Sequence, residues 1–194
     1  MKQQKTWVSP YNDGQVIAGQ GTIGLEVLNS PLLAGEGPGV KSWLVPVGGG
    51  GLLAGIGSCI QKQTHRPRLI GAQAEVAPFM HSLFYTSTQD GIPDLPSLAD
   101  GLTGEVEHGS VTIPMVKHLV DEIVLVSEAE IARAIAFAWY VYEEKLEGAG
   151  AVGLAAFLAK KVKAGPALVV VTGGNVQPEV HAEIVKRFAG ERWD

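Results

Sequence analysis

Short apolar runs, each bounded by glycine, proline or charged residues, alternate along the chain with longer stretches of mixed polarity. Such short runs are typical of buried strands, and the longer stretches favour helices. The predicted strands are 43–47, 69–73, 122–126 and 167–171, and the predicted helices are 17–28, 51–63, 77–85, 128–145, 149–163 and one that starts at Pro178. This alternation predicts a three-layer α/β fold, with a mainly parallel, twisted sheet that carries helices on both faces.

Local signals mark two helix starts and one unusual loop. Ser127 and Glu130 have the spacing of a capping box, and Pro178 suits the first turn of a helix. Residues 89–111 are rich in Asp, Gly, Pro and Ser and are too long for a passive connection, so we expect a functional loop. We expect both chain ends, 1–5 and 190–194, to be disordered.

Composition narrows the possible functions. A chain of 194 residues that is 46% hydrophobic predicts one α/β domain over 1–194. The net charge of -5, with no block of like charges, argues against a nucleic-acid partner. We expect no membrane partner and a cytoplasmic location, because no apolar segment resembles a signal or a transmembrane span. The single cysteine, Cys59, favours a buried, inert thiol, and the five histidines show no metal spacing and are expected mostly at the surface.

Four consecutive glycines stand between a predicted strand and a predicted helix, at Gly48, Gly49, Gly50 and Gly51, and Leu52 follows them. Without Cβ atoms, successive backbone N–H groups can converge on an anion, and the helix N-terminus adds partial positive charge. The segment therefore predicts a phosphate-binding loop, with a tight structural turn as the alternative. It is not a P-loop, because no Gly-Lys-Ser/Thr follows.

Other glycine motifs are less specific. Residues 19–24 match a dinucleotide fingerprint, but a full strand before it and an acidic residue after the next strand are missing, which favours a structural helix start. Residues 172–175, Thr-Gly-Gly-Asn, follow the last predicted strand, where parallel sheets bind ligands, although a satisfied turn is the alternative. Asp100-Gly101 and residues 147–151 are, by themselves, typical of turns.

Taken together, five segments resemble the threonine dehydratase and serine racemase group of fold-type II pyridoxal-phosphate enzymes. They match in order and spacing and lie at 16–26, 45–55, 98–101, 147–151 and 170–175. The resemblance extends from about residue 7 to 188. It implies part of the fold of the tryptophan synthase β subunit, and pyridoxal 5′-phosphate as the cofactor.

The resemblance also implies roles for individual residues. Gly48, Gly49, Gly50, Gly51 and Leu52 would hold the cofactor phosphate. Thr172 would face the pyridine nitrogen with Gly173 beside it, Glu147 and Gly148 would lie near the ring, and Asp100 and Gly101 would belong to the substrate rim. A hydroxyl cannot protonate the pyridine as a carboxylate would, which suits elimination of a β-hydroxyl group.

Two departures from the family pattern affect the expected chemistry. Residues 71–75 read Gly-Ala-Gln-Ala-Glu, whereas some members have a cation-binding glutamate there, so we expect no metal site. The motif of the Schiff-base lysine does not occur, and the lysines present are expected at the surface or at helix ends. We therefore expect the C-terminal, cofactor-cradling lobe of such an enzyme, without its lysine-bearing N-terminal part and with no catalytic residue of its own.

The favoured hypothesis is the C-terminal part of a threonine or serine dehydratase, an ammonia-lyase that gives a 2-oxo acid and ammonia from an amino acid in the intact enzyme. This chain alone should then be inactive. The alternatives are a non-catalytic module that binds phosphate ligands or pairs with another subunit, and a nicotinamide-binding module. We expect a homo-oligomer, or pairing with a lysine-bearing N-terminal part, because such a lobe would expose apolar sheet surface.

Overall fold

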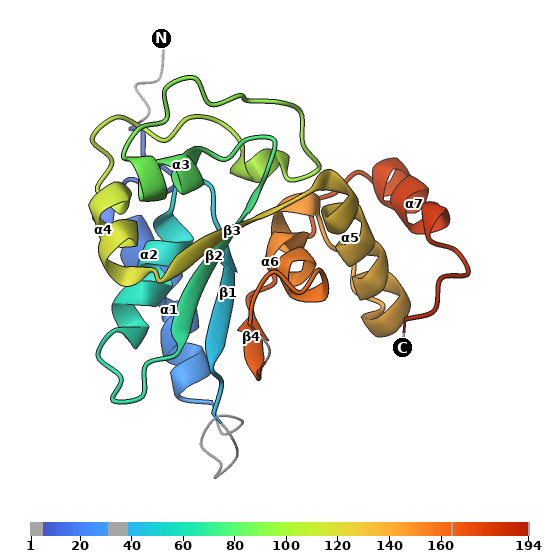
Figure 1. The fold of residues 1–194 in the computed structure, drawn as a ribbon, viewed down its shortest axis with the longest axis horizontal. Coiled ribbons are helices and arrows are strands. Elements are labelled where there is room, and N and C mark those ends of the chain that lie inside the picture. The colour runs from blue at the N-terminus through green and yellow to red at the C-terminus, as the bar shows by residue number, and fades with distance from the viewer. Residues whose placement is uncertain (1–5, 31–38, 164, 194) are drawn as a thin grey trace.

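The computed structural model describes residues 6–30, 39–163 and 165–193. Within these ranges the strands form a parallel four-stranded sheet in the order β3-β2-β1-β4 (Figure 1). The strands are β1 (Ser42–Pro46), β2 (Arg68–Ala74), β3 (Glu122–Val126) and β4 (Ala167–Val169). The helices are α1 (Gly14–Leu28), α2 (Gly51–Ile60), α3 (Phe79–Thr86), α4 (Thr112–Leu119), α5 (Glu128–Tyr142), α6 (Gly148–Leu158) and α7 (Pro178–Arg187), with a 3₁₀ helix, η1, at Asp100–Leu102. The predicted α/β class and parallel sheet are confirmed.

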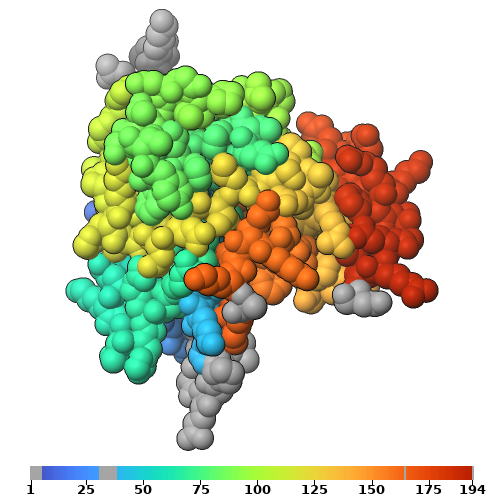
Figure 2. All heavy atoms as spheres, in the orientation of Figure 1, coloured from blue at the N-terminus to red at the C-terminus, as the bar shows by residue number. Residues whose placement is uncertain are grey.

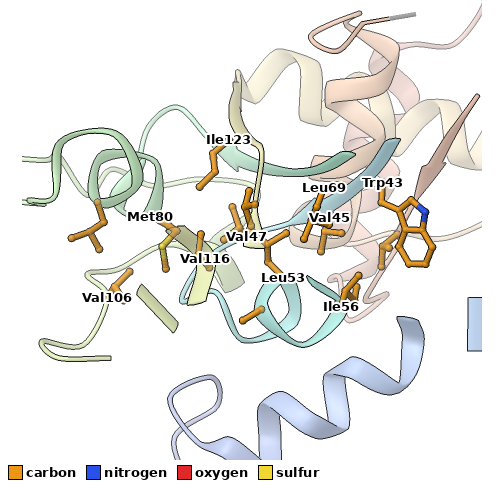
Figure 3. Packing of buried hydrophobic residues seen from close by; sticks show 14 of the residues in the cluster. Trp43, Val45, Val47, Leu53, Ile56, Leu69, Met80, Val106, Val116 and Ile123 are labelled. Carbon is orange, nitrogen blue, oxygen red and sulfur yellow. The ribbon is translucent and has the colours of Figure 1, made fainter. Parts of the chain in front are cut away.

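Helices cover both faces of the sheet, because successive side chains of a buried strand point to opposite faces. Trp43 and Val45 of β1 belong to a cluster with α2, α3 and α4, whereas Leu44 packs with α5, α6 and α7. Figure 3 shows the first cluster, in which Val45 and Leu69 of the strands lie near Leu53 and Ile56 of α2. The helix α1 packs on the outer side of α2. In Figure 2 the last helical segment, in red, projects beyond the rest of the molecule on one side.

The two predicted helix starts are confirmed. The Ser127 hydroxyl accepts a hydrogen bond from the Glu130 amide at 3.3 Å, and the Glu130 carboxylate accepts one from the Ser127 amide at 2.8 Å. Pro178 occupies the first turn of α7. The helix predicted to reach residue 145 ends at Tyr142, because Glu143 takes a left-handed conformation with φ 57°.

Sequence patterns missed α4 and η1. The proline at position 114 argues against a helix, but it lies in the first turn of α4, where the missing N–H has no intrahelical partner to lose. The predicted loop 89–111 is fastened internally, since the buried Gln89 side chain donates to the Val106 carbonyl at 2.8 Å and accepts from the Val106 amide at 3.0 Å. This loop therefore has a defined shape.

The expectation of disorder at 190–194 is wrong for the residues described there. Trp193 contacts the Phe137 ring edge-on and lies under the Arg133 guanidinium, which pairs with Glu191 at 2.6 Å. Aromatic packing and an ion pair thus tie this end to α5. The other predicted disordered end, 1–5, lies outside the described residues.

Lysine, histidine and cysteine side chains differ in how far they are exposed to solvent. Every lysine that the structure describes is exposed, as expected: Lys41, Lys62, Lys117, Lys145, Lys160, Lys161, Lys163 and Lys186. The expectation that most histidines lie at the surface is confirmed, since His65, His108 and His118 are exposed, whereas His181 is buried and His81 is half-buried. Cys59 is half-buried rather than buried, and its thiol donates to the Gly21 carbonyl at 3.0 Å. In the described ranges, no helix is long and apolar enough to cross a membrane.

Candidate functional site

A cavity of about 330 Å³ lies beyond the carboxyl ends of the adjacent strands β1 and β4. It brings together the tetraglycine segment and Thr172, which are more than a hundred positions apart in the sequence. Its lining consists of Pro10, Tyr11, Pro46, Gly48, Gly49, Gly50, Gly51, Leu52, Gly101, Leu102, Thr103, Gly104, Glu105 and Thr172. One small ligand could therefore touch both of the features that the sequence singled out.

The tetraglycine segment forms the start of α2, with Gly50 as the N-cap in a left-handed conformation, φ 89°. In the part of the chain that the structure describes, no hydrogen bond joins the amides of Gly48, Gly49 or Gly50 to another protein group. The first amides of α2 also have no partner within the helix. This end of the helix thus offers free N–H donors and the positive end of a dipole to an anion.

Close packing explains why side chains are excluded from this segment. A Cβ on Gly49 would overlap the Tyr11 ring, and a Cβ on Gly48 would lie 3.0 Å from the Leu102 Cα atom. Lysine and arginine do not line this cavity, and the exposed Glu105 is its charged residue. An anion bound here would therefore be held by backbone amides.

Thr172 lies directly against Gly150 of the neighbouring helix α6. The half-buried Thr172 lies shortly after β4. Just beyond the end of β4, the Val170 amide donates a hydrogen bond to the Leu44 carbonyl of β1 at 2.9 Å, so the chain still runs alongside β1 there. A Cβ on Gly150 would overlap the Thr172 carbonyl, so only glycine lets α6 approach so closely. The following residue, Gly173, has φ 70° and lies against the Glu147 side chain.

A second cavity, of about 650 Å³, is lined by three more of the predicted residues, Asp100, Glu147 and Gly148. It adjoins the first along the chain, because Asp100 lines one and Gly101 lines the other. Gly148 is buried, and a Cβ on it would overlap the Leu98 carbonyl, so this glycine also permits close packing. The structure thus distributes the predicted residues over two neighbouring cavities, except for Gly173, which lines neither of them.

Several residues that shape the first cavity were missed by sequence reasoning. Glu128 anchors the loop that bears Gly101, accepting from the Ser97 hydroxyl at 2.6 Å and from the Leu98 amide at 2.7 Å. Glu107 accepts from Ser9 at 2.8 Å and from Asn12 at 2.7 Å, which fixes the segment that carries Tyr11. These are isolated polar residues without a local pattern, so no sequence signal marked them.

Residues 71–75 offer no cluster of metal ligands. The Gln73 side chain is buried, and its Oε1 accepts from the His81 amide at 2.9 Å, while its Nε2 has no hydrogen-bond partner. Burial lowers the pKa of the neighbouring His81. Across the described residues, no three side chains of His, Cys, Asp or Glu gather in a way that could hold a metal ion.

The segment 19–24 is not a nucleotide loop and does not start a helix, because it lies inside α1, which begins at Gly14 after the N-cap Asp13. Two of its glycines, Gly21 and Gly24, face α2 instead. A Cβ on Gly24 would lie 2.9 Å from the Cβ of Cys59, and a Cβ on Gly21 would lie 3.0 Å from the Gly55 carbonyl oxygen. The motif therefore serves the contact between two helices.

Comparison with known proteins gives a consistent family. The model of the family described as "Pyridoxal-phosphate dependent enzyme" matches residues 1–173. The L-threonine ammonia-lyase of Thermotoga maritima is 40% identical over 189 residues, covering 95% of this chain and 45% of that protein. The L-threonine ammonia-lyase of Geobacter sulfurreducens is 41% identical over 183 residues, covering 93% and 44%. The crystal structure of serine racemase from Dictyostelium discoideum is 30% identical with a TM-score of 0.74, covering 88% and 53%.

The chain thus spans about half the length of the relatives that it matches. The cofactor of this family is pyridoxal phosphate, and two features of the site match its chemical groups. Free amides at the start of α2 suit a phosphate, and the Thr172 hydroxyl in the same cavity suits a ring nitrogen. The residues present therefore fit pyridoxal phosphate.

Proposed function

Because this chain belongs to the family of pyridoxal-phosphate dependent enzymes, we propose that it is the cofactor-cradling part of an ammonia-lyase for L-threonine or L-serine. The observation that carries the proposal is the single cavity shared by the tetraglycine segment and Thr172. The names of the relatives from Thermotoga maritima and Geobacter sulfurreducens support the reaction class and L-threonine as a substrate. The products would be a 2-oxo acid and ammonia.

The backbone at the start of α2 would bind the cofactor phosphate. The amides of Gly48 to Gly51 and of Leu52 would donate hydrogen bonds to its oxygens, and the helix dipole would favour its negative charge. Leu52 lines the cavity and would also exclude water from one side. Phosphate binding here needs no cationic side chain.

Thr172 would set the electronic character of the cofactor. Its hydroxyl would share a hydrogen bond with the ring nitrogen, and Gly173, with φ 70°, would lie beside it. When bound, pyridoxal phosphate supplies an electron sink for negative charge that develops on an amino acid. Because a hydroxyl does not transfer a proton to the ring as a carboxylic acid would, Thr172 would favour loss of a β-hydroxyl over reactions that need a long-lived carbanion.

The second cavity would border the substrate. Glu147 and Gly148 would lie near the ring, and Asp100 with Gly101 would form the rim where the amino acid enters. Glu147 is held in position by the Asn175 amide at 2.9 Å, so its carboxylate has a defined orientation.

The lysine that such chemistry requires would come from outside the residues described. A Schiff-base lysine should be desolvated to lower its pKa, whereas every lysine that the structure describes is exposed. We therefore expect this chain by itself to bind cofactor without turnover and to need a lysine-bearing partner segment. A homo-oligomer, or a pair with such a segment, would cover apolar surface of this lobe.

The proposal is tested with pyridoxine 5′-phosphate, which lacks the aldehyde and so cannot react with the exposed lysines. We expect it to bind, to compete with inorganic phosphate, and to bind at least about 10-fold more tightly than pyridoxine, because ionic hydrogen bonds contribute strongly. Thr172→Val should weaken binding and Thr172→Ser should retain it. Equal affinity for pyridoxine and its phosphate would refute the phosphate loop.

Activity assays separate the two main possibilities. No ammonia should form from L-threonine with the isolated chain, and a lysine-bearing N-terminal segment of a relative should restore ammonia release. Phosphate-ligand binding that never yields turnover with any such segment would instead identify a non-catalytic binding module.

A further inference from the structure

Thr112, the first residue of α4, makes a buried contact with the tetraglycine segment. Its side chain is 0% exposed, and its hydroxyl donates a hydrogen bond to the Gly49 carbonyl at 2.6 Å. Ser110 lies 2.8 Å from the same hydroxyl oxygen and accepts from the Thr112 amide at 3.3 Å. Since the Thr112 proton points to Gly49, the Ser110 hydroxyl donates to Thr112 Oγ1.

This contact fixes the peptide plane between Gly49 and Gly50. The carbonyl and the N–H of a trans peptide point in opposite directions, and no cis peptide bond occurs among the described residues. Thr112 does not line the cavity, whereas Gly49 and Gly50 do. With its carbonyl held by Thr112, this peptide points the Gly50 N–H away from Thr112, which is not a lining residue of the cavity.

We propose that Thr112 is a positioning residue for the phosphate loop, which it serves by orienting the Gly50 amide toward the ligand. The inference rests on the proposed function for the identity of the ligand, and on the Thr112 contact for the geometry. Thr112 itself does not touch the ligand. Without the Thr112 hydroxyl, the four consecutive glycines would have many accessible backbone conformations, and their amides would become ordered only when the ligand binds.

Side chains of α4 pack closely against Gly50. A Cβ on Gly50 would lie 2.9 Å from Met80 Cε, 3.1 Å from Thr112 Cβ and 3.2 Å from Val116 Cγ2. Met80 and Val116 are labelled in Figure 3, where they extend from α3 and α4 into the shared core. Side chains of α3 and α4 thus pack against the left-handed Gly50. Among these mostly apolar neighbours, the Thr112 hydroxyl provides the hydrogen bond to the Gly49 carbonyl.

The experiment compares Thr112→Val, which keeps the shape but removes the donor, with Thr112→Ser, which keeps the hydroxyl. Two quantities are measured by NMR on the full chain: the amide resonances of Gly48 to Gly51 without ligand, and the affinity for inorganic phosphate. We expect Thr112→Val to shift the Gly50 amide resonance and to weaken phosphate binding by about 10-fold, the effect of one hydrogen bond. Thr112→Ser should stay within about 3-fold of the parent chain.

Thr22→Val is the matched control. The Thr22 hydroxyl also donates to a glycine carbonyl, that of Gly19 at 2.7 Å, but on the exposed side of α1. It should change neither measurement. If Thr112→Val fails to fold, Ser110→Ala provides the test, because it removes the donor to Thr112 Oγ1 together with the weaker acceptor of the Thr112 amide, and it should shift the Gly50 resonance in the same direction.

The outcomes distinguish this inference from the proposed function. An unchanged Gly50 resonance in Thr112→Val, or in Ser110→Ala where that variant replaces it, overturns the positioning role. A parent chain that binds neither phosphate nor pyridoxine 5′-phosphate overturns the proposed function, and the Gly50 resonance then decides on Thr112 alone. Phosphate affinity lost equally in Thr112→Ser and Thr112→Val also counts against the hydroxyl.

Discussion

The Glu147 carboxylate accepts a hydrogen bond from the Asn175 amide at 2.9 Å, which joins the start of α6 to the segment after β4. A second bond runs from the Glu147 amide to the Gly173 carbonyl at 3.3 Å. The N-cap residue of α6 therefore secures the segment that follows Thr172.

Replacing this carboxylate should loosen the segment. We expect Glu147→Ala to lower the free energy of unfolding by ~1 kcal/mol, because it removes one hydrogen bond to a charged acceptor at an exposed position, and Glu147→Gln to lose less. Urea unfolding measures both. Glu144→Ala, at an exposed residue of the same segment, is the control and should remain near the parent value. Equal losses in Glu147→Ala and Glu144→Ala would mean that the bond contributes nothing.

Gly150 and Gly153, both on α6, should respond differently to alanine. A Cβ on Gly150 would overlap the Thr172 carbonyl, whereas a Cβ on Gly153 would lie at an ordinary 3.4 Å from Val169. Gly150→Ala should cost about 1–3 kcal/mol of stability through overpacking and also weaken binding of pyridoxine 5′-phosphate, because Thr172 is displaced. Gly153→Ala should change stability little. Thermal unfolding and a ligand titration provide the comparison, and similar results for both variants would contradict the packing described.

Two glycines of α1 provide a pair that tests the helix contact. Gly19 has open space around its Cα atom, so Gly19→Ala should stabilise the chain by about 0.5–1 kcal/mol through helix propensity. Gly24 lies against Cys59, so Gly24→Ala should destabilise it by about 1–3 kcal/mol. Chemical denaturation of both variants measures these changes in the free energy of unfolding. Stabilisation by Gly24→Ala would show that α1 does not pack closely against α2.

The buried His181 predicts a dependence of stability on pH. Burial lowers the pKa of its imidazole, and the positive charge of Lys145 lowers it further. The unfolded chain therefore takes up a proton near its ordinary pKa of about 6.5, whereas the folded chain does so only at lower pH. The free energy of unfolding should fall as the pH drops below about 6.5 and level off once the folded-state pKa is passed.

Histidine replacement checks the origin of this dependence. His181→Gln should flatten the fall in stability between pH 7 and pH 5, with His81 contributing the slope that remains, since burial lowers its pKa too. Measurements at pH 8, where both states carry neutral imidazole, isolate the change in packing against Trp139. An unchanged slope in His181→Gln would assign the pH dependence to other groups.

The strands were predictable because each contains a short apolar run, and β1 and β2 are buried on both faces. Leu44 and Ile70 are fully buried. A short apolar run of this kind indicates a buried strand of a parallel sheet from its composition alone. Helix ends were less predictable. Glu143 stops α5 through its backbone conformation, which composition does not encode, and the proline at position 114 conceals α4.

The family resemblance predicted that the tetraglycine segment and Thr172 meet at one cofactor. Strand polarity agrees, because both come after parallel strands, and the structure adds that β1 neighbours β4. Contacts that depend on loops did not follow. Thr112 and Tyr11 reach the glycines through connections whose course is set only by tertiary packing. The residue types that could line the site follow from the sequence, whereas the residues that hold them in place are set by tertiary packing.

The first cavity takes its walls from four stretches of chain, near residues 10, 50, 103 and 172. None of these stretches can form a wall before the sheet has paired from β1 to β4 and the intervening loop has closed. Occupancy of the cavity is therefore coupled to the cooperative folding of the whole lobe. Added phosphate ester should raise the melting temperature of distant helices such as α7 together with that of α2, by mass action on one folded state.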